Sequence, residues 1–221
     1  SSRRRHTRFR NVTGVQTCAL PICSADPDTI TSTSWANGGH TFVAWSWDNG
    51  TRVYNLTTDT WHDRESYNDD RWRVSHVVRF GNILIAGDYA TGAVYKMTAD
   101  TYDEAGDPLI MTIQTPPVHA FPQRLQFNAL FIDIVPGVGL NTTAAQDLDP
   151  EIMVRWTDNG GRTWSNERQE PLGPLGDYTR RAVTRRLGTG NANGRVFKLS
   201  ISAAVAKAIQ SLSADVEKLA A

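Results

Sequence analysis

Cysteine is scarce in this chain: Cys18 and Cys23 are the only two among 221 residues. This excludes a disulfide scaffold and a zinc site built from cysteine pairs. Long apolar runs are also missing, since no stretch approaches the ~20 residues that a membrane-spanning helix needs. We therefore expect neither a metal centre of that kind nor a membrane segment.

Recognisable catalytic motifs are absent as well. The sequence contains no Gly-x-Ser-x-Gly elbow, no phosphate-binding glycine loop and no His-Glu-x-x-His helix. Histidines occur without metal-ligand spacing, at His40, His62, His76 and His119. The acids of Asp69-Asp70 and Asp147-Leu148-Asp149 could bind calcium, but acids are ordinary in polar loops of this kind. We predict no enzyme, no catalytic residue, no metal and no cofactor.

The first 22 or so residues do not have the composition of a folded domain. Ser1 to Arg10 is rich in arginine, and the stretch ends in Cys18-Ala19-Leu20-Pro21-Ile22. It resembles a translated sequencing adapter, whereas a basic arm or a targeting peptide are the alternatives. We expect residues 1–23 to be disordered and exclude them from the fold. Without the five arginines of this stretch, 18 of the 23 basic residues remain against 23 acids, a formal charge of −5.

Short β-type runs separated by Gly, Asn and Asp predict an all-β domain over residues 24–200. A repeat supports this: Val53 to Trp61 aligns without gaps on Val94 to Tyr102, 41 residues later. That period is typical of a four-stranded propeller blade, although two hairpins can be similar by chance. Two copies are too few to close a propeller, so we expect a partial, propeller-like domain of antiparallel hairpins from the C-terminal part of a longer protein.

The stretch Arg155 to Glu167 predicts a strand, a tight turn and a second strand. Its spacing matches the Asp-box hairpin, with Asn in place of Asp, at Thr157, Asn159, Gly161, Thr163 and Trp164. In this motif the polar side chain bonds the amides of the turn, glycine permits the bend, and Trp packs beneath it. We interpret these residues as structural.

The C-terminus changes period. Apolar residues spaced by four and three predict one face of an amphipathic helix over residues 201–221, at Val205, Ile209, Leu212, Val216 and Leu219. Several alanines add helix propensity, and Ser202 could cap the first turn. Such a narrow apolar stripe fits docking against the β domain or a short coiled coil.

Arginines are concentrated between residues 180 and 186. Arg180, Arg181, Arg185 and Arg186 could meet the acids of a neighbouring subunit or phosphates, or form a solvated strand surface. No aromatic residues are interleaved and the chain is net acidic, so direct DNA binding is not supported. A sialidase-like enzyme would need a converging arginine triad, for which Arg155 and these four are available.

From residue 41 onward, the order of motifs resembles the packaged-DNA stabilisation proteins of short-tailed phages, also called tail accessory factors or tail hub proteins. The resemblance lies in Trp72–His76, Gly87–Tyr95, Gly106–Leu109, Val154–Trp156 through Trp164–Glu167, Arg185–Gly188 and Arg195–Phe197. The predicted C-terminal helix departs from the shorter ending expected of that family.

The resemblance implies a virion structural protein of the head-to-tail junction, assembled in the host cytoplasm. Its partners would be portal, connector and tail proteins, and it would form a homo-oligomeric ring that helps close the portal channel and retain packaged DNA. The alternatives are a sialidase-like or carbohydrate-binding Asp-box propeller, and a kelch-like scaffold.

Overall fold

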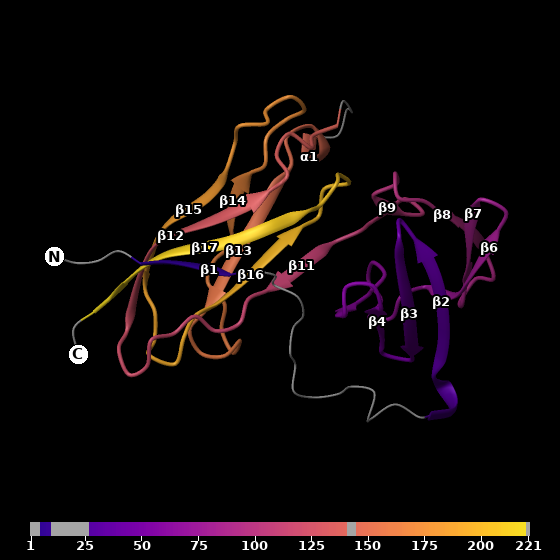
Figure 1. Ribbon diagram of the computed structural model, residues 1–221, viewed down its shortest axis with the longest axis horizontal. Helices are drawn as coiled ribbons and strands as arrows, with labels where there is room; N and C mark the ends of the chain where they lie inside the picture. Colours follow the sequence, from indigo (N-terminus) through magenta and orange to yellow (C-terminus); the bar gives the residue numbers. More distant parts are fainter. Residues whose placement is uncertain (1–4, 10–26, 141–144, 220–221) are drawn as a thin grey trace. The chain divides into compact units, whose positions relative to one another are not determined.

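The computed structural model describes residues 5–9, 27–140 and 145–219 (Figure 1). In this part of the chain the predicted β class is confirmed, because antiparallel strands supply nearly all regular structure. The helical segments are a 3-10 turn at Pro27–Thr29 and the short α1, Ala145–Leu148. Two compact units are present: the N-terminal unit lies within Thr13–Leu109, and the C-terminal unit contains Ile110–Ala221 and β1. The sequence predicted one domain over 24–200.

The N-terminal unit contains two antiparallel meanders and a small hairpin, each in chain order. The first meander has four strands: β2 (Thr31–Asn37), β3 (His40–Trp47), β4 (Gly50–Asn55) and β5 (Thr60–Asp63). The second has three: β6 (Val74–Phe80), β7 (Ile83–Asp88) and β8 (Val94–Met97). The hairpin pairs β9 (Asp103–Glu104) with β10 (Asp107–Pro108).

One apolar core joins the two meanders. Inward-facing residues of β2, β3, β4, β6 and β7, together with Trp72 of the segment before β6, form one buried cluster: Trp35, Ala44, Val53, Trp72, Val74, Val77, Leu84 and Ala86. Trp35 stacks on Phe42 of the neighbouring strand, with ring centroids 5.2 Å apart. Phe42 and Met97 also pack against this core, while the residues that alternate with the inward ones lie on the outer faces of the two sheets.

The two copies of the 41-residue repeat are alike only in their first strand. The first copy runs from the end of β4 through a turn to the start of β5, whereas the second begins with β8 and forms no second strand by Tyr102. A four-stranded meander is the form expected of a propeller blade. The sheets among the described residues do not close on themselves, so the propeller is not confirmed.

The C-terminal unit is a β-sandwich of two four-stranded sheets. The first sheet runs β1 (Arg5–Phe9), β17 (Ile209–Lys218), β12 (Leu125–Ile134), β15 (Ala182–Thr189). The second runs β11 (Met111–Gln114), β16 (Val196–Ile201), β13 (Glu151–Thr157), β14 (Arg168–Pro171). Both contribute to one buried core, in which Phe127 and Phe197 meet edge to face at 5.7 Å.

The predicted C-terminal helix is wrong. Residues 209–218 form β17, which pairs with β12 on one side and β1 on the other (Figure 1). Leu212, Ala214 and Val216 are buried in alternation, a period of two that coincides with the four-and-three spacing at Leu212 and Val216. Pairing and burial in the sheet outweigh the modest helix propensity of the alanines.

The N-terminal segment differs from expectation in one place. Arg5–Phe9 form β1, antiparallel to β17, where disorder was expected. A strand edge presents unpaired backbone groups that any extended segment can satisfy, so this pairing does not depend on side-chain sequence. The rest of residues 1–23 lies outside the described residues.

Candidate functional site

The turn after β13 is held by its own side chains. The Asn159 side-chain oxygen accepts hydrogen bonds from the Thr163 amide at 3.0 Å and from the Thr157 hydroxyl at 2.8 Å. Its side-chain nitrogen donates to the Thr163 hydroxyl at 2.7 Å, and the Gly161 amide donates to the Thr157 hydroxyl at 3.1 Å. The short polar residues therefore replace the backbone pairing that the turn lacks.

Glycine and tryptophan complete this turn. Gly160 and Gly161 have φ values of +71° and +91°, a region that suits glycine. Trp164 is half-buried, and the Lys198 ammonium lies 5.9 Å from its ring centroid. These contacts are structural in kind, while the assignment to the Asp-box class stays an interpretation.

A buried ion pair beside this turn was missed by the sequence reasoning. Arg195 is 2% exposed and contacts Asp158 through two hydrogen bonds of 2.7 Å. Its remaining nitrogen donates to the Leu187 carbonyl at 2.7 Å, and its guanidinium lies 4.6 Å from the Phe127 ring centroid. Arg195 thereby connects β13, β15 and β12. A single arginine before a strand carries no sequence signal for this role.

The four arginines of the predicted interface fall into two pairs. Arg180 and Arg181 form surface ion pairs with Asp177 at 3.0 Å and Asp133 at 2.9 Å. Arg185 and Arg186 are exposed on β15, next to its bulge opposite β12. Their carbonyls accept hydrogen bonds from the Arg168 guanidinium. The Arg168 guanidinium thus holds the backbone of the bulge in place, while the side chains of Arg185 and Arg186 face outward.

The arginine triad of a sialidase-like site is not assembled by the residues named for it. Arg155 donates to the Ser165 carbonyl at 3.2 Å and so supports the turn. Arg180 and Arg181 are engaged by the two separate acids described above. Nothing in this arrangement directs several arginines at one carboxylate.

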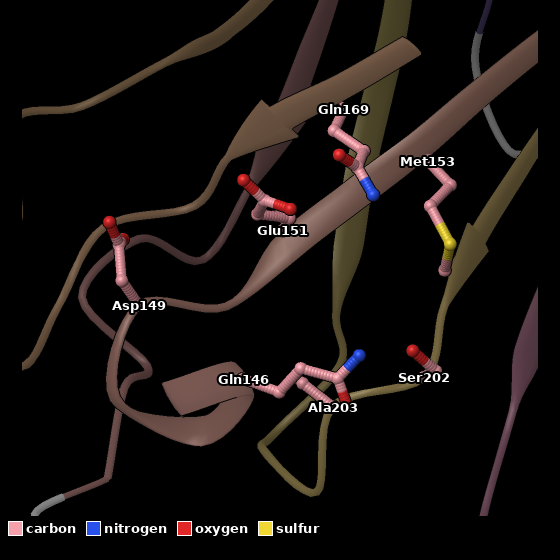
Figure 2. Close-up of a pocket in the computed structure, with 7 residues that line it drawn as sticks. All are labelled: Gln146, Asp149, Glu151, Met153, Gln169, Ser202 and Ala203. Carbon is pink, nitrogen blue, oxygen red and sulfur yellow. The ribbon is translucent and has the colours of Figure 1, made fainter. Parts of the chain in front are cut away.

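A polar pocket of about 340 Å³ lies beside α1 in the C-terminal unit (Figure 2). Its lining comes from α1, β13, β14 and the segment after β16: Gln146, Asp149, Glu151, Met153, Gln169, Ser202 and Ala203. Figure 2 shows the Ser202 hydroxyl set apart from the Asp149 and Glu151 carboxylates. The pocket has no histidine, and its serine has no adjacent base in this view, so the arrangement suits hydrogen bonding to a polar surface better than nucleophilic chemistry.

Two of the four acids considered for calcium, Asp69 and Asp147, have protein partners. Asp69 accepts from the Tyr89 hydroxyl at 2.7 Å and the Arg71 amide at 3.0 Å, and Asp147 accepts from the Ala204 amide at 2.9 Å. Within the described residues, no cluster of three or more His, Cys, Asp or Glu side chains is placed to hold a metal ion. Across the same ranges, no helix has both the length and the apolar character to span a membrane.

Two aromatic rings enclose Arg64 in the N-terminal unit. Its guanidinium carbon lies 4.7 Å from the Trp72 ring centroid and 5.4 Å from that of Trp35. Burial lowers the pKa of Arg64, and the nearby Glu104 carboxylate opposes that effect. On β5, which ends just before Arg64, desolvation and then the Arg64 charge lower the pKa of His62 to about 4, so this imidazole is neutral at pH 7.

Two outer sheet faces of the N-terminal unit are rich in apolar side chains, which the sequence reasoning also missed. The aliphatic face, on β6–β8, consists of Val78, Phe80, Ile83, Ile85 and Val94, with His76 and Lys96 at its margin. The aromatic face, on β3–β5, consists of Trp45, Tyr54 and Trp61, with the Arg52–Asp63 ion pair of 2.9 Å beside them.

Comparison with known proteins gives one family match. Residues 111–217 match the family described as Bacteriophage P22 Gp10, beta-sandwich. The matched range coincides with the sandwich from β11 to β17. The match supports a structural protein of a phage virion.

The other comparisons add little. No curated protein matches the chain. Among solved structures, an exo-beta-1,3-galactanase from Phanerochaete chrysosporium, crystallised with galactose, is similar at 10% identity and a TM-score of 0.29, over 84% of this chain and 57% of the other. The chain thus spans just over half of that enzyme, and so low a score carries no argument about function.

Proposed function

We propose that this chain is part of a virion structural protein at the head-to-tail junction of a short-tailed phage, where it helps to close the portal channel and retain packaged DNA. The observation that carries this proposal is the match of residues 111–217 to a phage β-sandwich family, over a range that forms a self-contained unit. The motif order from residue 41 onward resembles the same class of protein.

The function would be steric and interfacial. Pressurised DNA pushes on a plug that is held by protein–protein contacts, and no covalent bond is made or broken. This task requires rigid subunits, and the sandwich supplies rigidity through a core that joins both sheets and through the Arg195–Asp158 pair. The described side chains include polar and apolar surfaces for binding, and we propose no catalytic residue among them.

Arg185 and Arg186 are our preferred contacts of the sandwich with a neighbouring virion protein. Both side chains face outward from a bulge that Arg168 fixes, so they are presented at a defined position. Arginine is enriched where interfaces concentrate their binding energy, and its planar group pairs with carboxylates. The partner surface would therefore carry acids.

The test uses DNA-filled phage heads that carry the connector but lack the hub protein. Adding the full chain should bind the connector and protect the packaged DNA from nuclease. The double variant Arg185→Glu with Arg186→Glu should bind at least tenfold more weakly. The single variants Arg185→Glu and Arg186→Glu are also measured, and Arg162→Glu, which reverses one exposed arginine in the turn after β13, is their charge-matched control. Failure of the wild-type chain to bind the connector would overturn the proposal.

A further inference from the structure

We infer that the N-terminal unit binds a second copy of this chain head to tail, with the aliphatic face of one copy packed on the aromatic face of the next. This contact would join the subunits of the homo-oligomeric ring, and its role in a virion rests on the proposed function. The contact itself follows from the two outer faces and is measured without any other virion protein.

The outward side chains of the aliphatic face are largely exposed to solvent. Phe80 is 70% exposed, Val94 68% and Val78 61%. Register places Phe80 beside Ile83 and Val78 beside Ile85, so these side chains form one continuous patch across β6 and β7. Contiguous apolar patches on a protein surface mark interaction sites, whereas single apolar residues do not.

The aromatic face offers a matching surface. Trp61 is 48% exposed, and its ring lies 4.7 Å from Tyr54 and 5.6 Å from Trp45, centroid to centroid. The three rings therefore form one aromatic cluster, with neighbouring rings tilted by 32° and 30°, that is already packed together before any partner binds. Little side-chain freedom remains to be lost on binding, and aromatic residues of this kind dominate interface energies.

The charges at the margins of the two faces are complementary. Lys96 and His76 flank the aliphatic face, and the residues of β6–β8 that point the same way include no acid. The aromatic face has Asp63, paired with Arg52, and Asp59, which accepts from the Tyr54 hydroxyl. One face is thus net acidic and the other basic, which favours contact between unlike faces and disfavours two copies of the same face.

The position of the faces sets the type of assembly. The inner sides of both sheets share one core, so the two outer faces lie on opposite sides of the stack. Contact between unlike faces is heterologous, and such contacts form a ring when the rotation closes. Strand spacing of ~4.8 Å and rise of ~3.3 Å per residue give a patch of roughly 300–400 Å² per partner. Since a standard interface buries about 800 Å² per partner, one contact alone is weak.

The experiment measures self-association of the full chain by sedimentation equilibrium up to high concentration. We expect concentration-dependent oligomers for the wild type. Phe80→Asp, on the aliphatic face, and Trp61→Ser, on the aromatic face, should each weaken association at least tenfold. Leu175→Asp is the matched control, because Leu175 is 63% exposed and lies in the sandwich. Circular dichroism and thermal unfolding verify that each variant is folded.

Mixing the two variants distinguishes the geometries. Phe80→Asp keeps its aromatic face and Trp61→Ser keeps its aliphatic face, so an equimolar mixture should form a one-to-one pair that neither variant forms alone. Homodimers of either variant would show a contact between like faces and overturn the inference, as would a wild type that stays monomeric. Loss of association in Leu175→Asp would place the contact in the sandwich and also overturn it. None of these outcomes depends on connector binding.

Discussion

Arg195 and Asp158 lie next to each other in one sheet, just beyond the Thr157–Val196 pair of β13 and β16, and form a two-point ion pair. The Nε and Nη2 groups of Arg195 each donate a hydrogen bond of 2.7 Å to the two carboxylate oxygens of Asp158. The guanidinium also donates to the carbonyls of Leu187 and Thr189, so most of its polar capacity is used inside the protein. Asp158 directly precedes Asn159, and the pair therefore connects the turn after β13 to the core.

Removing one partner of this pair should destabilise the sandwich. Arg195→Met leaves Asp158 without its counter-ion, and we expect a loss of about 3 kcal/mol in the free energy of unfolding, since breaking a buried ion pair has effects of about 3–5 kcal/mol and Asp158 is partly exposed. Urea unfolding followed by circular dichroism measures this. If Arg195→Met and the surface control Arg162→Met are equally stable, the pair has no such role.

Asn159 should tolerate Asp but not Ala. Asn159→Asp keeps the acceptor of the Thr157 and Thr163 bonds, and the Thr163 hydroxyl can turn to donate. We expect a change within about 0.5 kcal/mol in the free energy of unfolding. Asn159→Ala loses the bonds of this side chain and should cost about 1–2 kcal/mol. Equal stability of the two variants in urea unfolding would contradict the geometry of the turn.

Ala214 distinguishes the observed strand from the predicted helix. Its side chain is fully buried between Leu212 and Val216 in β17, whereas a helix with the predicted stripe would place residue 214 on the opposite, solvent side. Ala214→Asp should therefore destabilise the sandwich by about 3–5 kcal/mol, because it buries an unpaired charge. Ser213→Asp, the neighbouring and less buried position, is the control. A small effect of Ala214→Asp on thermal unfolding would favour the helix.

His62 should make the N-terminal unit less stable in acid. Its pKa in the folded chain is about 4, below the ordinary value of about 6.5, so the unfolded chain binds a proton first as the pH falls. The contribution of neutral His62 is complete above pH 6.5 and is lost progressively between about pH 6.5 and 4. His62→Gln should lose less stability than the wild type over this range. The free energy of unfolding of both proteins is measured by urea unfolding at each pH. If it changes with pH in the same way for both, the pKa of His62 is not lowered.

Local features of the candidate site were accessible from the sequence, and its long-range features were not. Asn159 and Gly161 lie within a few residues of their partners, so spacing alone predicts the turn. Arg195 contacts Asp158 from 37 positions away, and the aliphatic face joins strands whose outward residues look like ordinary β alternation. Whether such a residue is covered or exposed depends on which sheet packs on which, and the pattern of one strand does not contain that information.

The sequence by itself determined the β class, the polar turn after β13 and the resemblance to phage proteins, because turn residues and period-two patterning act over short distances. The second strand predicted to end by Glu167 begins only at Arg168, in β14. Tertiary structure alone decided that residues 209–218 form a central strand. There Leu212 and Val216 fit both periods, and β12 offers a backbone ladder that the isolated segment lacks. It also decided that a sandwich forms from residue 110 onward, since a sheet must bury one face, and only the assembled chain brings the second sheet to cover it.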